Sequence, residues 1–234
     1  LENLSKPVIF TGSQIPLGQI RSDGRDNIIS SLLIAASGQV HEVCIYFNGV
    51  LLRGNRSTKR SSDQFEAFES PNDAPLAHAG IQIEYKKRVL RPASEEAFHF
   101  QPFKELPIGV IKIFPGIQFD YFESLMTDKL KGVVLETFGA GNIPGSAQNA
   151  LLPIIERAYQ NGTIITVCSQ CSQGAVSLGT YAASSALRRV GAVNGRDMTT
   201  EAALAKSYYL MSISDDMAFV KAQMQKNLRG ELTE

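Results

Sequence analysis

Histidine and cysteine are scarce in this sequence, which has three of each among its 234 residues. A structural zinc site needs four ligands, and His41, His78 and His99 are not paired at ligand spacing. The sequence also has no Ser-His-Asp signature, no HExxH motif and no P-loop. These absences exclude the common metal, nucleotide and histidine-based hydrolase motifs, and we expect neither a metal nor a cofactor.

Net charge is absent as well, because Lys and Arg total 23 and Asp and Glu also total 23. The sequence therefore has no basic footprint for nucleic acid or anionic lipid. No apolar run reaches the ~18 residues of a membrane span, and the first residues lack the apolar stretch of ~7–15 residues that a secretory signal has. The odd, low cysteine count argues against a disulfide scaffold. We expect a cytoplasmic protein that binds neither nucleic acid nor membranes.

The chain starts with leucine and not with an initiator methionine. Residues 1–7 read like the end of a helix that runs directly into a strand. We therefore expect the chain to begin in the middle of a fold.

Short apolar runs alternate with helical patterns. Strands are predicted at residues 7–10, 43–47, 50–52, 109–114, 132–135 and 163–167. Helices are predicted at residues 26–36 with Asp26 as cap, at 119–126 and 150–159, and at about 215–227 with Ser214 as cap. Asn48-Gly49 predicts a hairpin, because both positions favour positive φ. The alternation predicts an α/β fold with parallel sheets covered by helices.

Two regions interrupt this alternation. Residues 53–80 are polar and irregular, and a stretch of that length without regular structure is more often functional than idle. Residues 89–106 mix charges and prolines with few apolar runs, which is typical of a linker. We therefore expect one domain over residues 1–88, a linker over 89–106 and a second domain over 107–234.

Three features allow two interpretations each. Cys168-Ser169-Gln170-Cys171 has the spacing of a redox pair, but strand-end cysteines are more often small buried hydrophobic residues, which we favour. The segment 139–145 is too irregular for a dinucleotide loop, and is either a tight turn or a ligand-facing loop. Lys59 is either a solvated surface charge, which spacing alone favours, or an amine tuned for proton transfer.

Six motifs, in this order, resemble those of the bacterial-type L-asparaginases, most closely the cytosolic type I branch. They are Thr11-Gly12-Ser13-Gln14-Ile15-Pro16, Arg21-Ser22-Asp23-Gly24 with Asn27, Arg53-Gly54-Asn55-Arg56-Ser57-Thr58-Lys59, Phe68-Glu69-Ser70-Pro71-Asn72, Gly139-Ala140-Gly141-Asn142 and Asn227-Leu228-Arg229-Gly230-Glu231-Leu232. The resemblance runs through essentially the whole chain.

The resemblance implies a fold, an assembly and a reaction. The fold is a Rossmann-like N-terminal α/β domain, of which this chain carries the later part, joined to a smaller flavodoxin-like C-terminal α/β domain. The assembly is a homodimer, or a homotetramer made of two dimers, with each active site between the N-terminal domain of one subunit and the C-terminal domain of its partner. The reaction is metal-free hydrolysis of L-asparagine to L-aspartate and ammonia.

The resemblance also implies residue roles at the substrate site. Lys59 corresponds to the catalytic lysine, which acts with two threonines and an aspartate; one threonine is the nucleophile, activated by its neighbours. Asn142 is implied in substrate binding at the partner's site, and Tyr181 is a weaker candidate for the same role.

A second set of residues resembles the effector pocket in which some type I enzymes bind asparagine cooperatively. These residues are Thr58, Ser169 and Cys171. An arginine that is usual there in the bacterial enzymes falls at Glu136. A carboxylate cannot replace a guanidinium that faces the ligand's own carboxylate, so we do not expect the bacterial type of allosteric activation.

The family's Thr-Gly-Gly-Thr-Ile segment, which carries the nucleophile, and its Gly-Thr-Asp-Thr segment do not occur in this sequence. Lys59 without these partners cannot perform acyl transfer, so we expect the 234 residues alone to be inactive and the complete protein to be an amidohydrolase. Two alternatives remain: a non-catalytic protein that binds an amino acid or serves as a dimer partner, and the amidase component of a tRNA-dependent amidotransferase.

Overall fold

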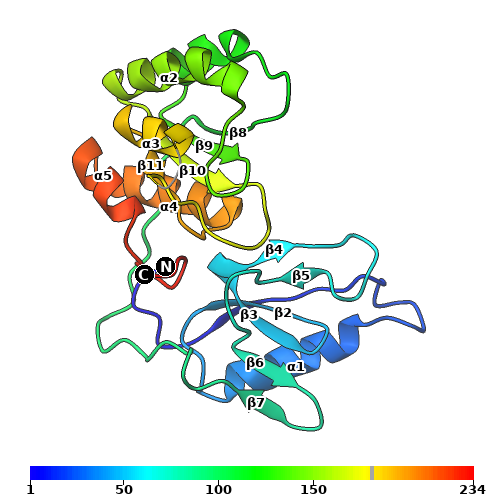
Figure 1. Cartoon of the computed structure of the whole chain (residues 1–234). Coiled ribbons are helices and arrows are strands. Elements are labelled where there is room, and N and C mark those ends of the chain that lie inside the picture. Colours follow the sequence, from blue (N-terminus) through cyan, green and yellow to red (C-terminus); the bar gives the residue numbers. More distant parts are fainter. Residues whose placement is uncertain (180–181) are drawn as a thin grey trace. The chain divides into compact units, whose positions relative to one another are not determined.

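The computed structural model describes residues 1–179 and 182–234. The chain divides into two compact units, Leu1–Gln101 and Pro102–Glu234, here called the N-terminal unit and the C-terminal unit (Figure 1). The boundary between them lies within residues 86–107, and in this wholly described stretch the chain forms no helix or strand beyond an isolated bridge between Glu2 and His99.

The sheet of the N-terminal unit has five strands in the order β1-β2-β3-β6-β7. The strands are β1 (Val8–Phe10), β2 (Val43–Phe47), β3 (Val50–Arg53), β6 (Ala77–Ala79) and β7 (Ile83–Tyr85). β1 and β2 are parallel because α1 (Gly24–Ala36) connects them, whereas the other neighbours are antiparallel. The α/β class is confirmed, but in this unit the parallel arrangement is limited to one pair of strands.

The predicted hairpin between β2 and β3 is confirmed. Asn48 and Gly49 have φ values of 47° and 78°, and Phe47 pairs with Val50 across the turn. The Asn48 N–H donates to the Asn27 side chain (3.1 Å), and Asn27 donates in turn to the Gly12 carbonyl (2.9 Å). The helix α1 is thereby fixed to the end of the hairpin through one buried amide.

The helix α1 begins two residues earlier than predicted, at Gly24 with Asp23 as the cap residue, so the prediction of Asp26 as cap was wrong. Asp26 instead lies in the first turn, where its charge suits the helix N-terminus. The Asp23 carboxylate accepts hydrogen bonds from the backbone N–H groups of Gln14 and Ile15 at 3.0 Å, which fixes the preceding loop.

The outer face of α1 is apolar. Its buried side consists of Gly24, Asn27, Ser31 and Ile34, whereas the exposed side carries Ile28, Ile29, Leu32 and Leu33. Leu32 and Leu33 are 64% and 58% exposed. Four large apolar side chains on one helix face form a patch of the kind that marks interaction or aggregation.

We therefore expect the 234-residue chain to self-associate through the outer face of α1. The double substitution Leu32→Glu with Leu33→Lys should shift the chain toward monomer in sedimentation velocity. Ile81→Glu is the matched control, because Ile81 is fully exposed but stands alone in the turn before β7. An equal shift in the control, or none in the double variant, would contradict the role of this face.

Residues 53–80, predicted to be irregular, contain more regular structure than expected. A 3₁₀ turn (Gly54–Arg56) is followed by β4 (Thr58–Lys59), β5 (Phe68–Glu69) and β6. β4 and β5 form a separate two-stranded antiparallel ribbon. Their two-residue length leaves almost no alternation for sequence reasoning to detect.

The C-terminal unit contains a four-stranded, fully parallel sheet in the order β11-β10-β9-β8. Its strands are β8 (Ile108–Lys112), β9 (Gly132–Thr137), β10 (Ile164–Ser169) and β11 (Val193–Asn194). Three of these strands were predicted, and the parallel α/β prediction is confirmed here without qualification.

Helices cover both faces of this sheet. The helix α2 (Gly145–Gln160) packs Leu151, Ile154 and Ile155 on one face, where they meet alternate residues of β9 and β10. The helices α4 (Thr200–Ile213) and α5 (Met217–Met224) cover the other face through residues such as Leu210 and Met224 (Figure 1). The strands are apolar on both sides because both sides are covered.

Several helix predictions need correction. Residues 119–126 form a 3₁₀ turn (Phe119–Phe122) and begin a π-helical turn (Leu125–Lys129), not an α-helix. The last helix is shorter than predicted, and its cap is Asp216, which accepts from Ala218 N at 2.8 Å, rather than Ser214. The helices α3 (Ala182–Arg189) and α4 were not predicted.

None of the helices in the described ranges is long and apolar enough to cross a membrane.

A buried ion pair holds the last residues of the chain against α4. The Lys206 Nζ lies 2.5 Å from Glu231 Oε1, and the two side chains are 4% and 5% exposed. Glu231 also accepts from the Leu228 and Arg229 N–H groups. Burial raises the pKa of the Glu231 carboxyl, but these hydrogen bonds and the Lys206 charge outweigh burial and leave the pKa below its ordinary value.

A carboxyl whose pKa is lower in the folded state stabilises the fold above its ordinary pKa and loses that contribution as pH falls through the folded-state pKa. We expect the free energy of unfolding to decrease below about pH 4.5 partly for this reason. Glu231→Gln should remove that part of the pH dependence and cost about 3–5 kcal/mol at neutral pH, because the buried Lys206 ammonium loses its carboxylate and keeps only the Lys226 carbonyl as an acceptor among the described residues. Glu123→Gln, which breaks a half-exposed pair with Arg157, is the control and should cost less than about 1 kcal/mol.

Candidate functional site

The ribbon of β4 and β5 carries Lys59. Lys59 pairs with Phe68 across the ribbon, and its Nζ lies 5.6 Å from the centre of the Phe68 ring. The Phe68 ring is tilted against the ring of Phe47, with the centroids 5.4 Å apart. Phe47 ends β2, so the aromatic contact fixes the ribbon to the main sheet of the N-terminal unit.

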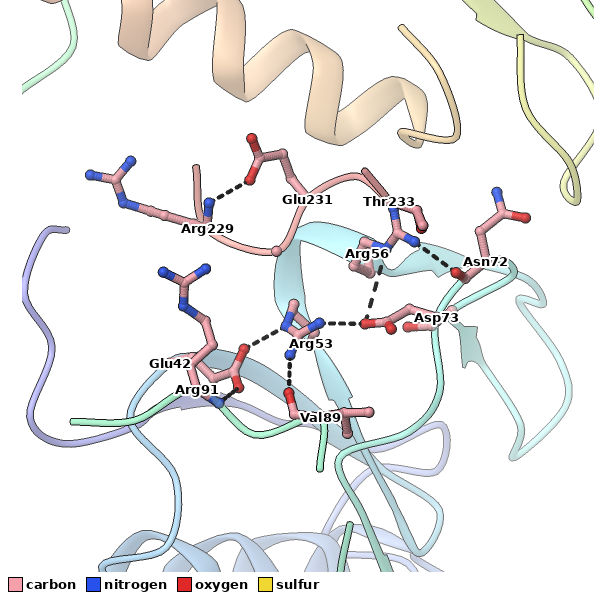
Figure 2. A network of polar contacts seen from close by, with 12 residues as sticks. Glu42, Arg53, Arg56, Asn72, Asp73, Val89, Arg91, Arg229, Glu231 and Thr233 are labelled. Atoms are coloured by element: carbon pink, nitrogen blue, oxygen red, sulfur yellow. Dashed lines mark hydrogen bonds and ion pairs between the residues drawn. The ribbon is translucent and has the colours of Figure 1, made fainter. Parts of the chain in front are cut away.

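A buried cluster of charges precedes the ribbon (Figure 2). The Arg53 guanidinium donates to Glu42 (2.6 Å), to Asp73 (2.7 Å) and to the carbonyl of Val89 (2.5 Å). Glu42 also accepts from Arg91 N at 3.2 Å. The Arg53 side chain, at the end of β3, therefore links Glu42 before β2 to the later segments that carry Asp73 and Val89.

The cluster extends to the turn that leads into β4. Arg56, which is 4% exposed, donates to the Asn72 carbonyl at 2.7 Å (Figure 2). The Ser57 hydroxyl donates to the Arg53 carbonyl (2.6 Å) and lies 3.2 Å from the Ser70 hydroxyl. These contacts hold the backbone directly before Thr58 and Lys59 in a fixed position.

The Lys59 side chain itself is exposed, and Thr58 beside it is half-buried. Among the residues that the structure describes, no carboxylate lies within ion-pair distance of the Lys59 nitrogen. The site in this unit is therefore a rigidly mounted, accessible amine, which can donate hydrogen bonds or take part in proton transfer once an acidic or hydroxyl group is brought to it.

The carboxyl ends of the parallel strands in the C-terminal unit bring Ser169 and Cys171 together. The Ser169 hydroxyl accepts from Cys171 N at 3.0 Å. Gln170 between them is fixed to the neighbouring strands, because its backbone N–H donates to the Thr137 carbonyl and its side chain donates to the Ile113 and Glu136 carbonyls. This is the edge at which ligands bind in open α/β sheets.

Glu136 lies on β9 near the same edge and is 17% exposed at its side chain. Its carboxylate accepts from the Thr200 hydroxyl at 2.6 Å and lies 3.9 Å from Lys112 Nζ. The carboxylate is therefore held by a hydroxyl and a cation from its own unit.

Asn142 lies in the loop that follows β9. Phe138 and Asn142 exchange two backbone hydrogen bonds of 2.9 and 2.8 Å, and Gly139 and Gly141 both have positive φ. The segment forms a tight turn and places Asn142 at the same sheet edge as Ser169, and the ligand-facing interpretation stays a prediction. Tyr181 lies outside the described residues.

The two strand-end cysteines are in different environments. Cys168 is buried, and burial raises its pKa to about 12, whereas Cys171 is exposed. Cys44 is also buried with its pKa raised to about 12, first by burial and also by Glu42. All three are free thiols, and the burial of Cys168 fits the interpretation of that cysteine as a small buried hydrophobic residue.

We expect a thiol reagent such as Ellman's reagent to modify one cysteine in the native chain and three in denaturant, because the thiolate is the reacting form and needs access. Cys171→Ser should abolish the native reaction, and Cys44→Ser should leave it unchanged. Two rapidly reacting thiols in the native chain would contradict this assignment.

Within the described ranges no group of three or more His, Cys, Asp or Glu side chains is arranged to hold a metal ion. Sequence reasoning missed the buried charges around Arg53, whose members are far apart in the sequence. It also missed a pocket lined by Arg188 and Arg196, which α3 and the turn after β11 bring together. The Asn194-Gly195-Arg196 turn after a strand was the available signal for the second feature.

Two family models cover most of the chain. Residues 1–91 match the model described as "Asparaginase, N-terminal", and residues 107–224 match "Glutaminase/Asparaginase C-terminal domain".

Individual proteins similar to this chain support the same family as the two models. L-asparaginase 1 of Escherichia coli K12 is 42% identical over 233 residues, which cover 100% of this chain and 68% of that protein. The crystal structure of L-asparaginase I from Vibrio cholerae is 43% identical, with a TM-score of 0.92 over 100% of this chain and 70% of that one. A glutamyl-tRNA(Gln) amidotransferase component of Pyrococcus abyssi is less similar, at 31% over 242 residues, and the match covers 100% of this chain and 54% of that protein.

The fold, the motifs around Lys59 and Asn142, and the family models over both units lead to one assignment. This chain belongs to the asparaginase family.

Proposed function

We propose that this chain is part of an L-asparaginase, an amidohydrolase that converts L-asparagine to L-aspartate and ammonia. The observation that carries the proposal is the 42% identity, over the entire chain, to a protein named L-asparaginase 1. The amidotransferase component remains a weaker alternative, because its identity is 31% and the match spans less of it.

In the proposed reaction a threonine hydroxyl attacks the amide carbon of asparagine, ammonia leaves, and water releases aspartate from the acyl-enzyme. Lys59 holds a proton or a hydrogen bond beside the nucleophile, and the rigid mounting of β4 supports this role. The nucleophile must come from polypeptide other than these 234 residues, since the threonine segments of the family do not occur in them.

Other residue roles belong to the same proposal. Asn142 contributes to substrate binding, as does Tyr181, while Thr58, Ser169 and Cys171 contact an effector amino acid. The position of Glu136 close to Ser169 and Gln170 supports our expectation that the effector response differs from the bacterial type, because a carboxylate repels an amino acid's carboxylate.

We also propose a homodimer or a dimer of dimers in the cytoplasm. The exposed, free thiol of Cys171 supports a reducing compartment.

An ammonia-release assay tests the proposed function. The 234-residue chain alone should produce no ammonia from asparagine. The same chain joined to the part of E. coli L-asparaginase 1 that it does not span should produce ammonia, and more from asparagine than from glutamine.

Activity of the 234 residues without any other polypeptide would overturn the need for an external nucleophile. Asparagine binding without hydrolysis in the joined, folded protein would instead favour the non-catalytic, amino-acid-binding alternative.

A further inference from the structure

A small pocket lies in the C-terminal unit at the carboxyl end of β11. Its volume is about 160 Å³, and it is lined by Leu178, Arg188, Ala192, Asn194, Arg196 and Gln225. Leu178 and Ala192 are buried and supply apolar wall, while the other four residues are polar. Two guanidinium groups and two amides, with no acidic residue among the six, form a donor set suited to an oxyanion.

Arg196 is held in a fixed backbone conformation. Its φ is +54°, which is uncommon for a side chain of this size. The Asn194 side chain accepts from Arg196 N at 2.8 Å, and Val176 N donates to the Arg196 carbonyl at 2.8 Å. These bonds fix the point from which the guanidinium extends.

The turn is also packed directly against the neighbouring strand. A Cβ at Gly195 would lie 2.5 Å from the Val167 carbonyl oxygen, so only glycine fits between Asn194 and Arg196. Gly195 N donates to the same carbonyl at 2.9 Å. These contacts with β10 fix the backbone that carries Arg196 at the carboxyl end of β11.

Arg188 approaches the pocket from the last turn of α3, and α5 leads to Gln225 on another side. Across the residues that the structure describes, no carboxylate lies within ion-pair distance of Arg188 or Arg196. Arg196 donates one hydrogen bond to the Thr233 carbonyl at 3.3 Å, which leaves most of the guanidinium N–H donors available for a ligand. Two arginines line one pocket with no carboxylate of the described residues paired to either, so a bound anion would find charged donors on two sides.

We propose that this pocket binds a small dianion whose oxygens accept hydrogen bonds from both guanidinium groups. The chemistry is shared by inorganic phosphate and by a dicarboxylate such as L-aspartate. The proposal does not depend on the amide hydrolysis proposed above, because it uses none of the residues assigned to that reaction.

Isothermal titration calorimetry on the full 234-residue chain tests the proposal, with sodium phosphate and sodium L-aspartate in separate arms at matched ionic strength. We expect saturable binding of phosphate, of L-aspartate or of both. The anion that binds more tightly identifies which of the two chemistries the pocket favours. Arg188→Gln and Arg196→Gln should each weaken that binding at least about tenfold, because each removes charge-assisted hydrogen bonds. Arg189→Gln is the control: it removes the adjacent charge on α3 but does not line the pocket.

Absence of saturable binding in both arms would overturn the proposal, as would equal weakening by Arg189→Gln, which would indicate a diffuse positive surface. Arg188 is exposed and can be replaced without affecting the core, so the test stands even if Arg196→Gln does not fold. A rise in the melting temperature with the same anion, lost in Arg188→Gln, gives an independent readout.

Discussion

Replacing Arg53 with methionine is expected to lower the free energy of unfolding by about 3–5 kcal/mol. Arg53 is 8% exposed and donates to two carboxylates and a carbonyl (Figure 2). Methionine fills a similar volume but leaves Glu42, which is 6% exposed, without its charged partner. The cost therefore comes from a buried, unpaired carboxylate more than from the lost contacts themselves.

Denaturant titration followed by circular dichroism measures this effect. Arg60→Met is the matched control, because Arg60 is 57% exposed at its side chain and its pairs with Glu66 and Glu69 are 3.7 Å long. The control should cost less than about 1 kcal/mol. Arg53→Lys should recover little of the loss, because an ammonium cannot form the forked contacts with Glu42 and Asp73. Equal costs for Arg53→Met and Arg60→Met would show that the cluster is not energetically coupled.

The parts of the fold that could be predicted are those set by local physics. The hairpin at Asn48-Gly49 follows from two residues that accept positive φ, and β9 and β10 follow from apolar runs that are buried on both faces. In contrast, α4 is rich in alanine and buries Ala202, Lys206 and Ser207 as well as leucine, so its apolar pattern does not mark a face. The only sequence signal for the start of α4 was the N-cap residue Thr199, whose hydroxyl accepts a hydrogen bond from Ala202 N.

The candidate site was less predictable than the fold. Spacing alone favoured a solvated Lys59, and in the structure of the single chain the Lys59 side chain is indeed exposed. What identifies the position is the surrounding motif and the family to which the chain belongs. The Arg53 cluster arises from long-range contacts, which no local pattern in the sequence reports. For the Arg188–Arg196 pocket, the Asn194-Gly195-Arg196 turn is a local signal, but it does not show that Arg188 and Gln225 converge on the same place.

Replacing Lys59 with methionine is expected to lower kcat for asparagine hydrolysis by about 10²–10⁴-fold in the protein joined to the missing family segment. The proposed role is proton transfer or hydrogen bonding to the nucleophile, which methionine cannot provide. Methionine loses the contact of the Lys59 ammonium with the Phe68 ring, but the side chain is exposed, so the free energy of unfolding should change by less than about 1 kcal/mol.

Two further variants separate chemistry from charge. Lys59→Arg keeps the positive charge and the contact with Phe68 but cannot release a proton, so we expect it to remain as inactive as Lys59→Met. Arg60→Met removes the next charge on the ribbon and should retain activity, because Arg60 pairs only weakly with Glu66 and Glu69. If Lys59→Met were as active as Arg60→Met, the amine on β4 would have no part in the reaction. If Lys59→Arg alone were active, the positive charge and not proton transfer would be the contribution of this residue.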